Sequence, residues 1–438
     1  MTKISTPTRP DYSAFAPDTK LREVKYGLPA EIRFCKRCVI SNQRPNSSIE
    51  FKNAPNEHKK TINLDDDGIC DACRVADQKA DVDWAAREEE LVELCARHRR
   101  TDGAYDCIIP GSGGKDSFYA THILKYKYGM HPLTVTWAPH IYTDWGWRNF
   151  QRWIHSGFDN QLFTPNGRVH RILTRLAMDK LLHPFQAFIL GQKNLAPKQS
   201  ILHDTPLVFF GENEAEYGNP QSDTSSAMRS RDYFTLKNKS EASLGGVPVE
   251  QLVQDFGIEE YELNPYLPAN PDDVERIGTE VHYLGYYLKW HPQSCYYYAQ
   301  EHGGFEPSPE RTPGTYSKYN SIDDRIDDLH YYTTFMKFGI GRATYDAAQE
   351  IRSGDIDRDD GIALVRRFDG EYPERFLDEI FEYLSIGEDE FPDAYPLFEQ
   401  PQMTREYFDA LCDQNRSPHI WNYENGAWSL RNAVWHND

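Results

Sequence analysis

Residues Tyr105–Tyr119, YDCIIPGSGGKDSFY, contain the signal that decides the fold. A short apolar run precedes Ser-Gly-Gly-Lys-Asp-Ser and the start of an amphipathic segment, which predicts a strand, a tight turn and a helix N-terminus. Gly113 and Gly114 permit positive φ and let the backbone approach a ligand closely. Exposed amides and the helix dipole favour phosphate oxygens at such a turn. The stretch therefore predicts a phosphate-binding loop.

Four polar side chains of this loop can contribute to binding. Ser112 and Ser117 offer hydroxyl donors and Lys115 offers a positive charge. Asp116 stands where the longer Walker loop has no acid. The loop resembles the PP-loop, SGGxDS, of the ATP pyrophosphatases, which transfer AMP and release pyrophosphate. The resemblance implies bound ATP, with Lys115 and Asp116 in the catalytic machinery. The alternative is a glycine-rich turn that only joins a strand to a helix.

Strands and helices alternate through this part of the chain. The pattern predicts strands over 106–110, 132–138, 160–163 and 206–210, and helices over 116–128, 145–156 and 168–182. This order indicates an α/β fold with a parallel sheet and helices on both faces. Ligands bind beyond the carboxyl ends of such strands, so the loops after Pro110, Trp137, Phe163 and Phe210 should line one crevice.

Two further segments bring charged groups towards this predicted crevice. Glu212, Asn213 and Glu214 follow the strand over 206–210 and could hold Mg²⁺ on a triphosphate or position a substrate, although a solvated acidic turn is the alternative. Residues 191–194 are expected to close a helical region, with Lys193 directed at the pyrophosphate leaving group. A surface lysine near a helix C-terminus would explain Lys193 equally well.

Four of the eight cysteines form two Cys-x-x-Cys pairs, Cys35/Cys38 and Cys70/Cys73. Four thiolates complete a tetrahedral site with no open position, so we expect a structural zinc ion in a reducing compartment. A redox disulfide or free thiols are the alternatives. The other four cysteines are scattered and are expected to be small buried residues.

Composition limits the class of protein. The 438 residues suggest two or three domains. With 48 Lys and Arg against 68 Asp and Glu, the formal net charge is −20, which repels nucleic acid in the absence of a basic patch. No apolar run is long enough to span a bilayer, and the N-terminus lacks the pattern of a secretion signal. We therefore expect a cytoplasmic protein with no nucleic-acid partner and no membrane span.

The second half of the chain contains two distinctive blocks. Residues 282–305 are rich in Tyr and Trp, which suits a core, a subunit contact or the binding of sugars and bases. In residues 316–352, acidic residues cluster around Arg325, and Arg342, Asp346 and Glu350 recur on one helical face. A helix with many ion pairs is the alternative to a binding function. Residues 355–438 alternate helical stretches with turns.

From about Cys35 to the C-terminal tail the chain resembles the N-acetyl sugar amidotransferases of bacterial surface-polysaccharide and nonulosonate biosynthesis. The resemblance rests on the following segments: both Cys-x-x-Cys pairs, Ser112–Ser117, Gly211–Gly218, Leu284–Trp290 and Ser321–Arg352. Gly111 is a departure, because related loops often have Val, Ala or Phe there, and we expect it to alter loop flexibility more than chemistry.

The resemblance implies a reaction in which ATP activates the acetamido group of a sugar and ammonia converts it to an acetamidino group. Ammonia would come from a separate glutaminase and ammonia-channel pair. The implied cofactors are ATP, Mg²⁺ and structural Zn²⁺. Candidate catalytic residues are Asp116, Lys115, Lys193, Glu212 and Glu214; candidate substrate residues are Asn213, Asp324, Asp327, His330 and Arg342.

Four segments are expected from these signals. They are an N-terminal arm (1–34), a zinc module with a linker helix (35–100), a PP-loop domain with an insertion (101–275) and a mainly helical region for substrate or partner binding (276–438). Two other functions compete: a PP-loop tRNA thiolase, which needs a catalytic cysteine and a basic RNA face, and a non-catalytic zinc scaffold.

Overall fold

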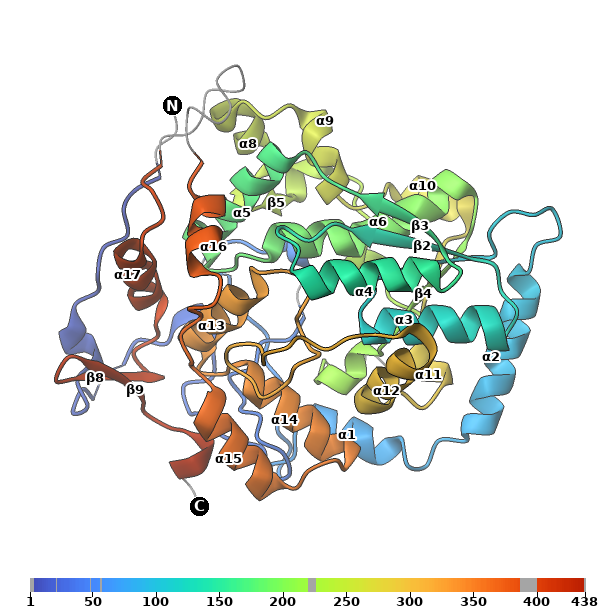
Figure 1. Ribbon diagram of the computed structural model, residues 1–438. Helices are drawn as coiled ribbons and strands as arrows, with labels where there is room; N and C mark the ends of the chain where they lie inside the picture. Colours follow the sequence, from blue (N-terminus) through green and yellow to red (C-terminus); the bar gives the residue numbers. More distant parts are fainter. Residues whose placement is uncertain are drawn as a thin grey trace.

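The computed structural model describes residues 4–20, 22–47, 49–55, 57–219, 226–386 and 400–436. Its centre is a five-stranded sheet in the order β3-β2-β1-β4-β7, with all four pairings parallel (Figure 1). The strands are β1 (Cys107–Pro110), β2 (Pro132–Trp137), β3 (Asp159–Phe163), β4 (Leu207–Phe210) and β7 (Glu280–Tyr283). The expected α/β fold with a parallel sheet is confirmed.

Helices cover both faces of this sheet because alternate strand residues point to opposite sides. Ile108 of β1 packs in one core cluster with α5 (Gly167–Leu181) and α6 (Gln186–His203). Its neighbour Ile109 packs in another cluster with α2 (Trp84–His98) and α3 (Lys115–His122). The last turns of α3 continue as a π-helical segment, Ile123–Lys127, and α4 (Asp144–His155) follows β2.

The strand order places a switch point at β1. The chain adds β2 and β3 on one side of β1 and then returns to add β4 and β7 on the other. Loops that leave adjacent strands in opposite directions at such a point open a crevice at the carboxyl edge. The loops after β1 and β4 therefore meet at the position where a ligand site is expected.

One strand is missing from the prediction, and one predicted helix end is wrong. Strand β7 was not predicted, because its four residues, Glu280–Tyr283, follow a polar stretch and contain two polar side chains, so they give little periodic signal. Residues 191–194 do not close a helix: α6 continues to His203, since Leu195, Ala196 and Ser200 stay buried against the sheet side of the molecule. The seven predicted strands and helices of the sheet region differ from the observed ends by about one residue, apart from the π-helical end of α3.

The N-terminal segment lies along the C-terminal part of the chain. Tyr12 stacks on Tyr423 with ring centroids 4.1 Å apart and donates a hydrogen bond to Asp413 at 2.9 Å. In Figure 1 this blue segment runs beside the red helix α17 (Arg405–Asn415) and the hairpin of β8 (Trp421–Glu424) and β9 (Ala427–Leu430). The two ends of the described chain thus stabilise each other.

The remaining elements surround the sheet. The further helices are α1 (Asp71–Gln78), α8 (Val249–Phe256), α9 (Glu260–Leu263), α10 (Pro271–Ile277), α11 (Leu284–Tyr287), α12 (Pro292–Gly303), α13 (Asp327–Phe338), α14 (Arg342–Ser353), α15 (Arg358–Phe368) and α16 (Leu377–Leu384). The further strands are β5 (Ser243–Leu244) and β6 (Val247–Pro248). Short 3-10 turns are η1 (Tyr12–Phe15), η2 (Lys25–Gly27), η3 (Glu50–Lys52), η5 (Glu214–Tyr217), η6 (Arg231–Tyr233), η7 (Lys239–Glu241), η8 (Asn264–Tyr266) and η10 (Val434–His436).

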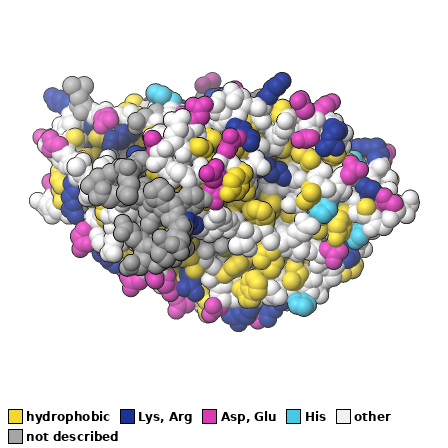
Figure 2. Space-filling model, turned by 90° about the horizontal axis from the view of Figure 1, so that it is seen from above, with side chains coloured by type: hydrophobic (Ala, Val, Ile, Leu, Met, Phe, Trp, Pro, Cys, Tyr) yellow, Lys and Arg dark blue, Asp and Glu magenta, His cyan; other side chains and the backbone are white. Residues whose placement is uncertain are grey.

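Among the described residues, no helix is both long and apolar enough to cross a membrane. On the face drawn in Figure 2, the Lys and Arg side chains that are described are interspersed with Asp and Glu rather than gathered into one basic patch.

Candidate functional site

A cavity of about 660 Å³ opens at the carboxyl ends of β1 and β4. The cavity is lined by the loop after β1 with the start of α3, the turn after β4, the region around the paired cysteines, and residues 319–352, together with Gln192 of α6 and Tyr283 of β7. Of the four loops predicted to line one crevice, those after Pro110 and Phe210 line this cavity, whereas no residue of the loops after Trp137 and Phe163 does. The region around the paired cysteines and residues 319–352 supply the other walls from distant parts of the chain. A concave site of this size suits a nucleotide or sugar ligand.

The loop after β1 has the conformation expected of a ligand-binding turn. Gly113 has φ = +86°, and a Cβ atom there would lie 2.7 Å from the Cα atom of Phe150 in α4. Only glycine fits such a position. Gly111 is required by packing, because a Cβ atom at this position would lie 2.3 Å from the Cβ atom of Ser117. The expectation that Gly111 mainly alters flexibility is therefore replaced by a packing requirement.

Lys115 and Asp116 form the charged centre of the loop. The buried Lys115 Nζ atom lies 2.5 Å from Asp116 Oδ2, and Asp116 Oδ1 is buried with no hydrogen-bond partner among the described residues. Burial lowers the pKa of Lys115, but the charges of Asp116 and Glu212 outweigh this effect and raise the pKa above its ordinary value. The lysine is thus held as a cation beside an unsatisfied carboxylate oxygen.

Glu212, Asn213 and Glu214, in the turn after β4, have different surroundings. Glu212 and Glu214 line the cavity, and Glu214 forms an ion pair with Arg229. Burial, with the nearby charge of Asp116, raises the pKa of Glu212 to about 8. Asn213 is buried outside the cavity wall, where its side chain accepts a hydrogen bond from the backbone N–H of Ala215 at 3.1 Å. Asn213 is therefore the N-cap residue of η5 (Glu214–Tyr217).

Lys193 is set back from the cavity. It lies in the interior of α6, and its neighbour Gln192 reaches the cavity wall instead. Burial lowers the pKa of Lys193, while Glu50 and Glu214 oppose that effect. Lys193 therefore lies outside the cavity wall, where the charges of Glu50 and Glu214 act on it.

Of the four substrate-binding candidates in the C-terminal half, two line the cavity and two do not. His330 and Arg342 line the cavity, and Arg342 Nε lies 3.0 Å from Asp346 Oδ1. Asp324 and Asp327 are not in the wall. Asp324 accepts hydrogen bonds from the backbone N–H of His140 at 2.6 Å and from His140 Nδ1 at 2.7 Å, so it fixes the loop after β2.

Asp323 is a cavity residue that the site prediction omitted. It accepts a hydrogen bond from Ser112 Oγ, and burial raises its pKa to about 6. The acidic cluster over 323–328 was the available signal, but the sequence did not indicate which of its members meets the loop. Arg44 and Arg352 were also missed, and no local pattern marks either of them as a cavity residue.

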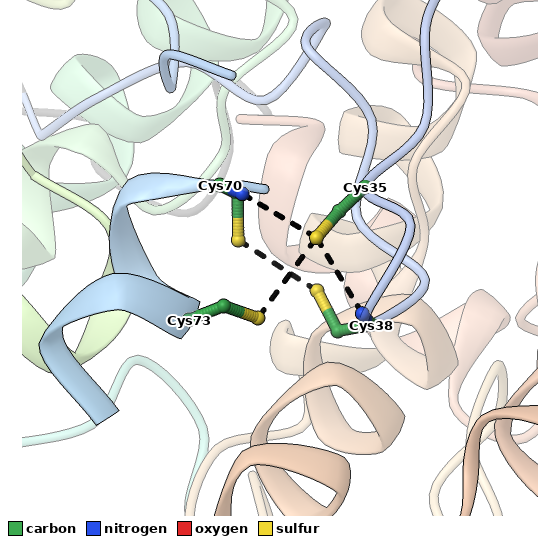
Figure 3. A group of neighbouring side chains, drawn as sticks. All are labelled: Cys35, Cys38, Cys70 and Cys73. Atoms are coloured by element: carbon green, nitrogen blue, oxygen red, sulfur yellow. Dashed lines mark hydrogen bonds between the residues drawn. The ribbon is translucent and has the colours of Figure 1, made fainter. Parts of the chain in front are cut away.

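The paired cysteines converge into one buried cluster (Figure 3). Their Sγ atoms all lie within 4.8 Å of one another, with 3.9 Å between Cys35 and Cys73 and 3.7 Å between Cys38 and Cys70. Four sulfurs at the Zn–S distance in a tetrahedron are about 3.8 Å apart. The cluster therefore fits a structural zinc ion, whereas the sulfurs of a disulfide are about 2 Å apart.

This cysteine cluster supports the cavity wall. The four cysteines pack in one core with Ile62, Ala72, Ala347 and Ala348, the last two belonging to α14. Ile62, Ala72 and Ala348 also line the cavity. Among the eight cysteines, all of which are described, none contributes to the cavity wall. A metal ion held by these cysteines would therefore have a structural place, behind the cavity wall.

Comparison with known proteins gives two partial matches. Residues 313–434 match the family model described as "LPS biosynthesis protein WbpG-like, C-terminal domain". A second match is to "Uncharacterized protein MJ1599" of Methanocaldococcus jannaschii, 35% identical over 77 residues, which are 18% of this chain. The chain spans only 27% of the length of that curated relative. The family match includes Arg342 and Arg352 of the cavity wall and supports lipopolysaccharide biosynthesis as the coarse setting of the chain.

Proposed function

We propose that this chain is an ATP-dependent amidotransferase that converts the acetamido group of an N-acetylated sugar to an acetamidino group. The observation that carries the proposal is the shared cavity, in which Lys115 and Asp116 of the glycine loop face a wall formed by residues 319–352. The loop supports a PP-loop assignment, and the WbpG-like match supports a substrate from polysaccharide biosynthesis. The sugar would be nucleotide-linked or a nonulosonate precursor.

The reaction follows from the chemistry of an amide. An amide oxygen is a poor leaving group, so transfer of AMP from ATP to that oxygen, with release of pyrophosphate, makes it displaceable. Ammonia then adds to the carbon, and the oxygen leaves with AMP. The product carries a nitrogen where the amide carried its oxygen. Ammonia would be supplied by a separate glutaminase and channel pair.

The loop residues have distinct proposed roles. Backbone amides of Gly113 and Gly114, the hydroxyls of Ser112 and Ser117, and the Lys115 cation would hold phosphate oxygens and stabilise charge on pyrophosphate. The unsatisfied Asp116 Oδ1 atom, with Glu212, fits the oxygen ligands that Mg²⁺ prefers. Glu214 would position substrate through its pair with Arg229.

Other candidates would act less directly. His330 and Arg342 would contact the sugar from the wall, whereas Asn213, Asp324 and Asp327 would position neighbouring backbone or charges. Lys193 would add positive potential from behind the wall. We also propose the four segments 1–34, 35–100, 101–275 and 276–438, and a cytoplasmic location, where ATP is present and thiols stay reduced.

A tRNA thiolase is the competing enzyme class. It would need a catalytic cysteine at the nucleotide, but no cysteine lines the cavity, and Cys295, which lies near Lys115 and Asp116, is buried in α12. The zinc scaffold without activity would give no reason for a charged, unsatisfied Asp116 oxygen in the cavity.

The test is release of AMP and pyrophosphate from ATP in the presence of ammonium, with UDP-linked and free N-acetylated sugars as substrates. The expected product is lighter than the sugar by about one mass unit, because NH replaces oxygen. Release only with tRNA would support the thiolase, and no turnover with any substrate would support the scaffold.

A further inference from the structure

Arg44 presents an unpaired charge to the cavity. Its residue is 6% exposed, it lines the cavity, and its Nη1 atom is buried with no hydrogen-bond partner among the described residues. No described carboxylate forms an ion pair with it. Burying a charge without a partner is costly, so such an arginine persists where a ligand completes it.

The groups around Arg44 do not neutralise it. The Arg44 Cζ atom lies 5.8 Å from the ring centroid of Tyr345, a neutral side chain of α14. Burial lowers the pKa of Arg44, and the charge of Arg352 lowers it further. Both arginines line the cavity, so two guanidinium groups contribute positive charge to its wall.

The nearby acids have other partners. Asp346 lies 3.0 Å from Arg342 and accepts a hydrogen bond from Thr315 at 2.6 Å. Glu216, whose backbone oxygen accepts from Arg352 at 3.0 Å, pairs with Lys79 at 2.8 Å. The wall at Arg44 and Arg352 is thus left with excess positive charge.

We propose that Arg44 and Arg352 form a subsite for an oxyanion of the second substrate, separate from the phosphate loop Ser112–Ser117. A guanidinium group can bind either a phosphate or a carboxylate through two parallel hydrogen bonds. The anion would be the diphosphate of a nucleotide-linked sugar or the carboxylate of an acidic sugar. This inference rests on the proposed function for the identity of the second substrate, but the subsite itself is a matter of binding.

The competing explanation is that Arg44 only balances the negative charge of four thiolates that would bind a metal. The charge of Cys70 raises the pKa of Arg44, which is consistent with that role. That role predicts loss of zinc when Arg44 is replaced. A ligand-binding role predicts loss of anion affinity with zinc retained. The two explanations therefore differ in a measurement that does not require turnover.

The experiment is calorimetric titration of the full chain with UDP-N-acetylglucosamine, with N-acetylneuraminate and with ATP. The variants are Arg44→Gln and Arg352→Gln, with Arg44→Lys as the conservative change and Arg276→Gln, at an exposed ion pair, as the matched control. Zinc content is measured for each. If Arg44→Gln fails to fold, Arg352→Gln carries the test.

We expect Arg44→Gln and Arg352→Gln to weaken one of the two sugar probes at least tenfold, with Arg44→Lys in between. ATP affinity should stay within twofold and zinc content should be unchanged. The affected probe identifies the source of the anion.

Equal weakening of ATP would overturn the subsite as a separate one, and loss of zinc would assign Arg44 to the metal centre. Unchanged affinity, or no binding of either probe to the native chain, would also overturn the proposal. Failure of the proposed function would look different, because the anion would bind without AMP release.

Discussion

The two ends of the cavity are built in different ways. The phosphate-loop end uses one short segment, Gly111–Ser117, which consists of the loop after β1 and the first turn of α3. The arginine end joins Arg44, beside the cysteine cluster, to Arg352 on α14, 308 positions along the chain (352 − 44). The first end depends on local conformation and the second on long-range packing. We therefore expect single substitutions to affect the two ends of the cavity differently.

The largest effect is expected from the cysteine cluster, which packs against Ala347 and Ala348 of α14, the helix that carries Arg352. Cys70→Ser removes one of four ligands, and we expect zinc loss with destabilisation of at least about 4 kcal/mol, because metal-binding free energy is folding free energy. The melting temperature should fall by on the order of 10 °C. Zinc analysis and calorimetry measure both effects.

Cys95→Ala is the matched control, because Cys95 is buried in α2 outside the metal cluster. It should retain zinc. Full zinc binding by Cys70→Ser would show that the four thiols are not a metal site.

The second largest effect should be confined to the loop end. Asp116→Asn keeps the shape of the side chain but removes the charge next to Lys115, so AMP formation should fall about 10²- to 10³-fold while zinc content and melting temperature stay close to native. AMP release with ammonium and an acceptor sugar is the measurement. Asp232→Asn, at an exposed position, should behave as the native chain; near-normal AMP release by Asp116→Asn would remove Asp116 from the mechanism.

A smaller effect should come from the contact that links the loop to the C-terminal wall. Asp323 accepts from Ser112, so Asp323→Asn replaces a charged acceptor with a weaker one. Loss of about 1.4 kcal/mol is expected from such a change, which corresponds to about a tenfold rise in KM for ATP. Steady-state kinetics checks this, and Asp359→Asn on the exposed face of α15 serves as control. An unchanged KM would show that the contact does not position the loop.

The same contrast explains what could be predicted from the sequence. The alternation of apolar runs predicted four of the five sheet strands, because each signal is local. Of the four loops expected at the crevice, only those after Pro110 and Phe210 line the cavity. Strand β7 was missed, since four residues with mixed polarity depend on β4 for their pairing. Gly113 and Gly114 were both expected to allow positive φ, but only Gly113 adopts it, because Gly114 is the N-cap of α3 with φ = −66°.

Residues that depend on tertiary packing could not be ranked in this way. Asp323 and Asp324 are adjacent and chemically identical, yet one meets Ser112 and the other meets His140. Lys193 was expected at the crevice, but its neighbour Gln192 lines the cavity instead, because only one side of α6 faces the wall. Arg44 gave no signal, since only the fold brings it to the cavity.

The last prediction concerns Glu212, whose effect depends on pH and tests the loop end of the cavity. Its pKa is raised to about 8 from about 4.5, mainly by burial and then by Asp116. Between these values the folded chain retains a proton that the unfolded chain has released, so this group makes stability fall as pH rises, by at most about 1.4 kcal/mol per pH unit. Glu212→Gln removes that slope. As the pH rises from 5 to 8, the free energy of unfolding of the native chain should therefore decrease relative to that of the variant, as measured by urea titration.

Mg²⁺ should reduce this difference if Glu212 is its ligand, because a bound cation favours the ionised carboxylate. If the free energies of unfolding of the native chain and Glu212→Gln changed with pH in parallel, the buried, protonated state of Glu212 would be contradicted. Arg352→Gln, at the other end of the cavity, serves as the control and should keep the pH dependence of the native chain.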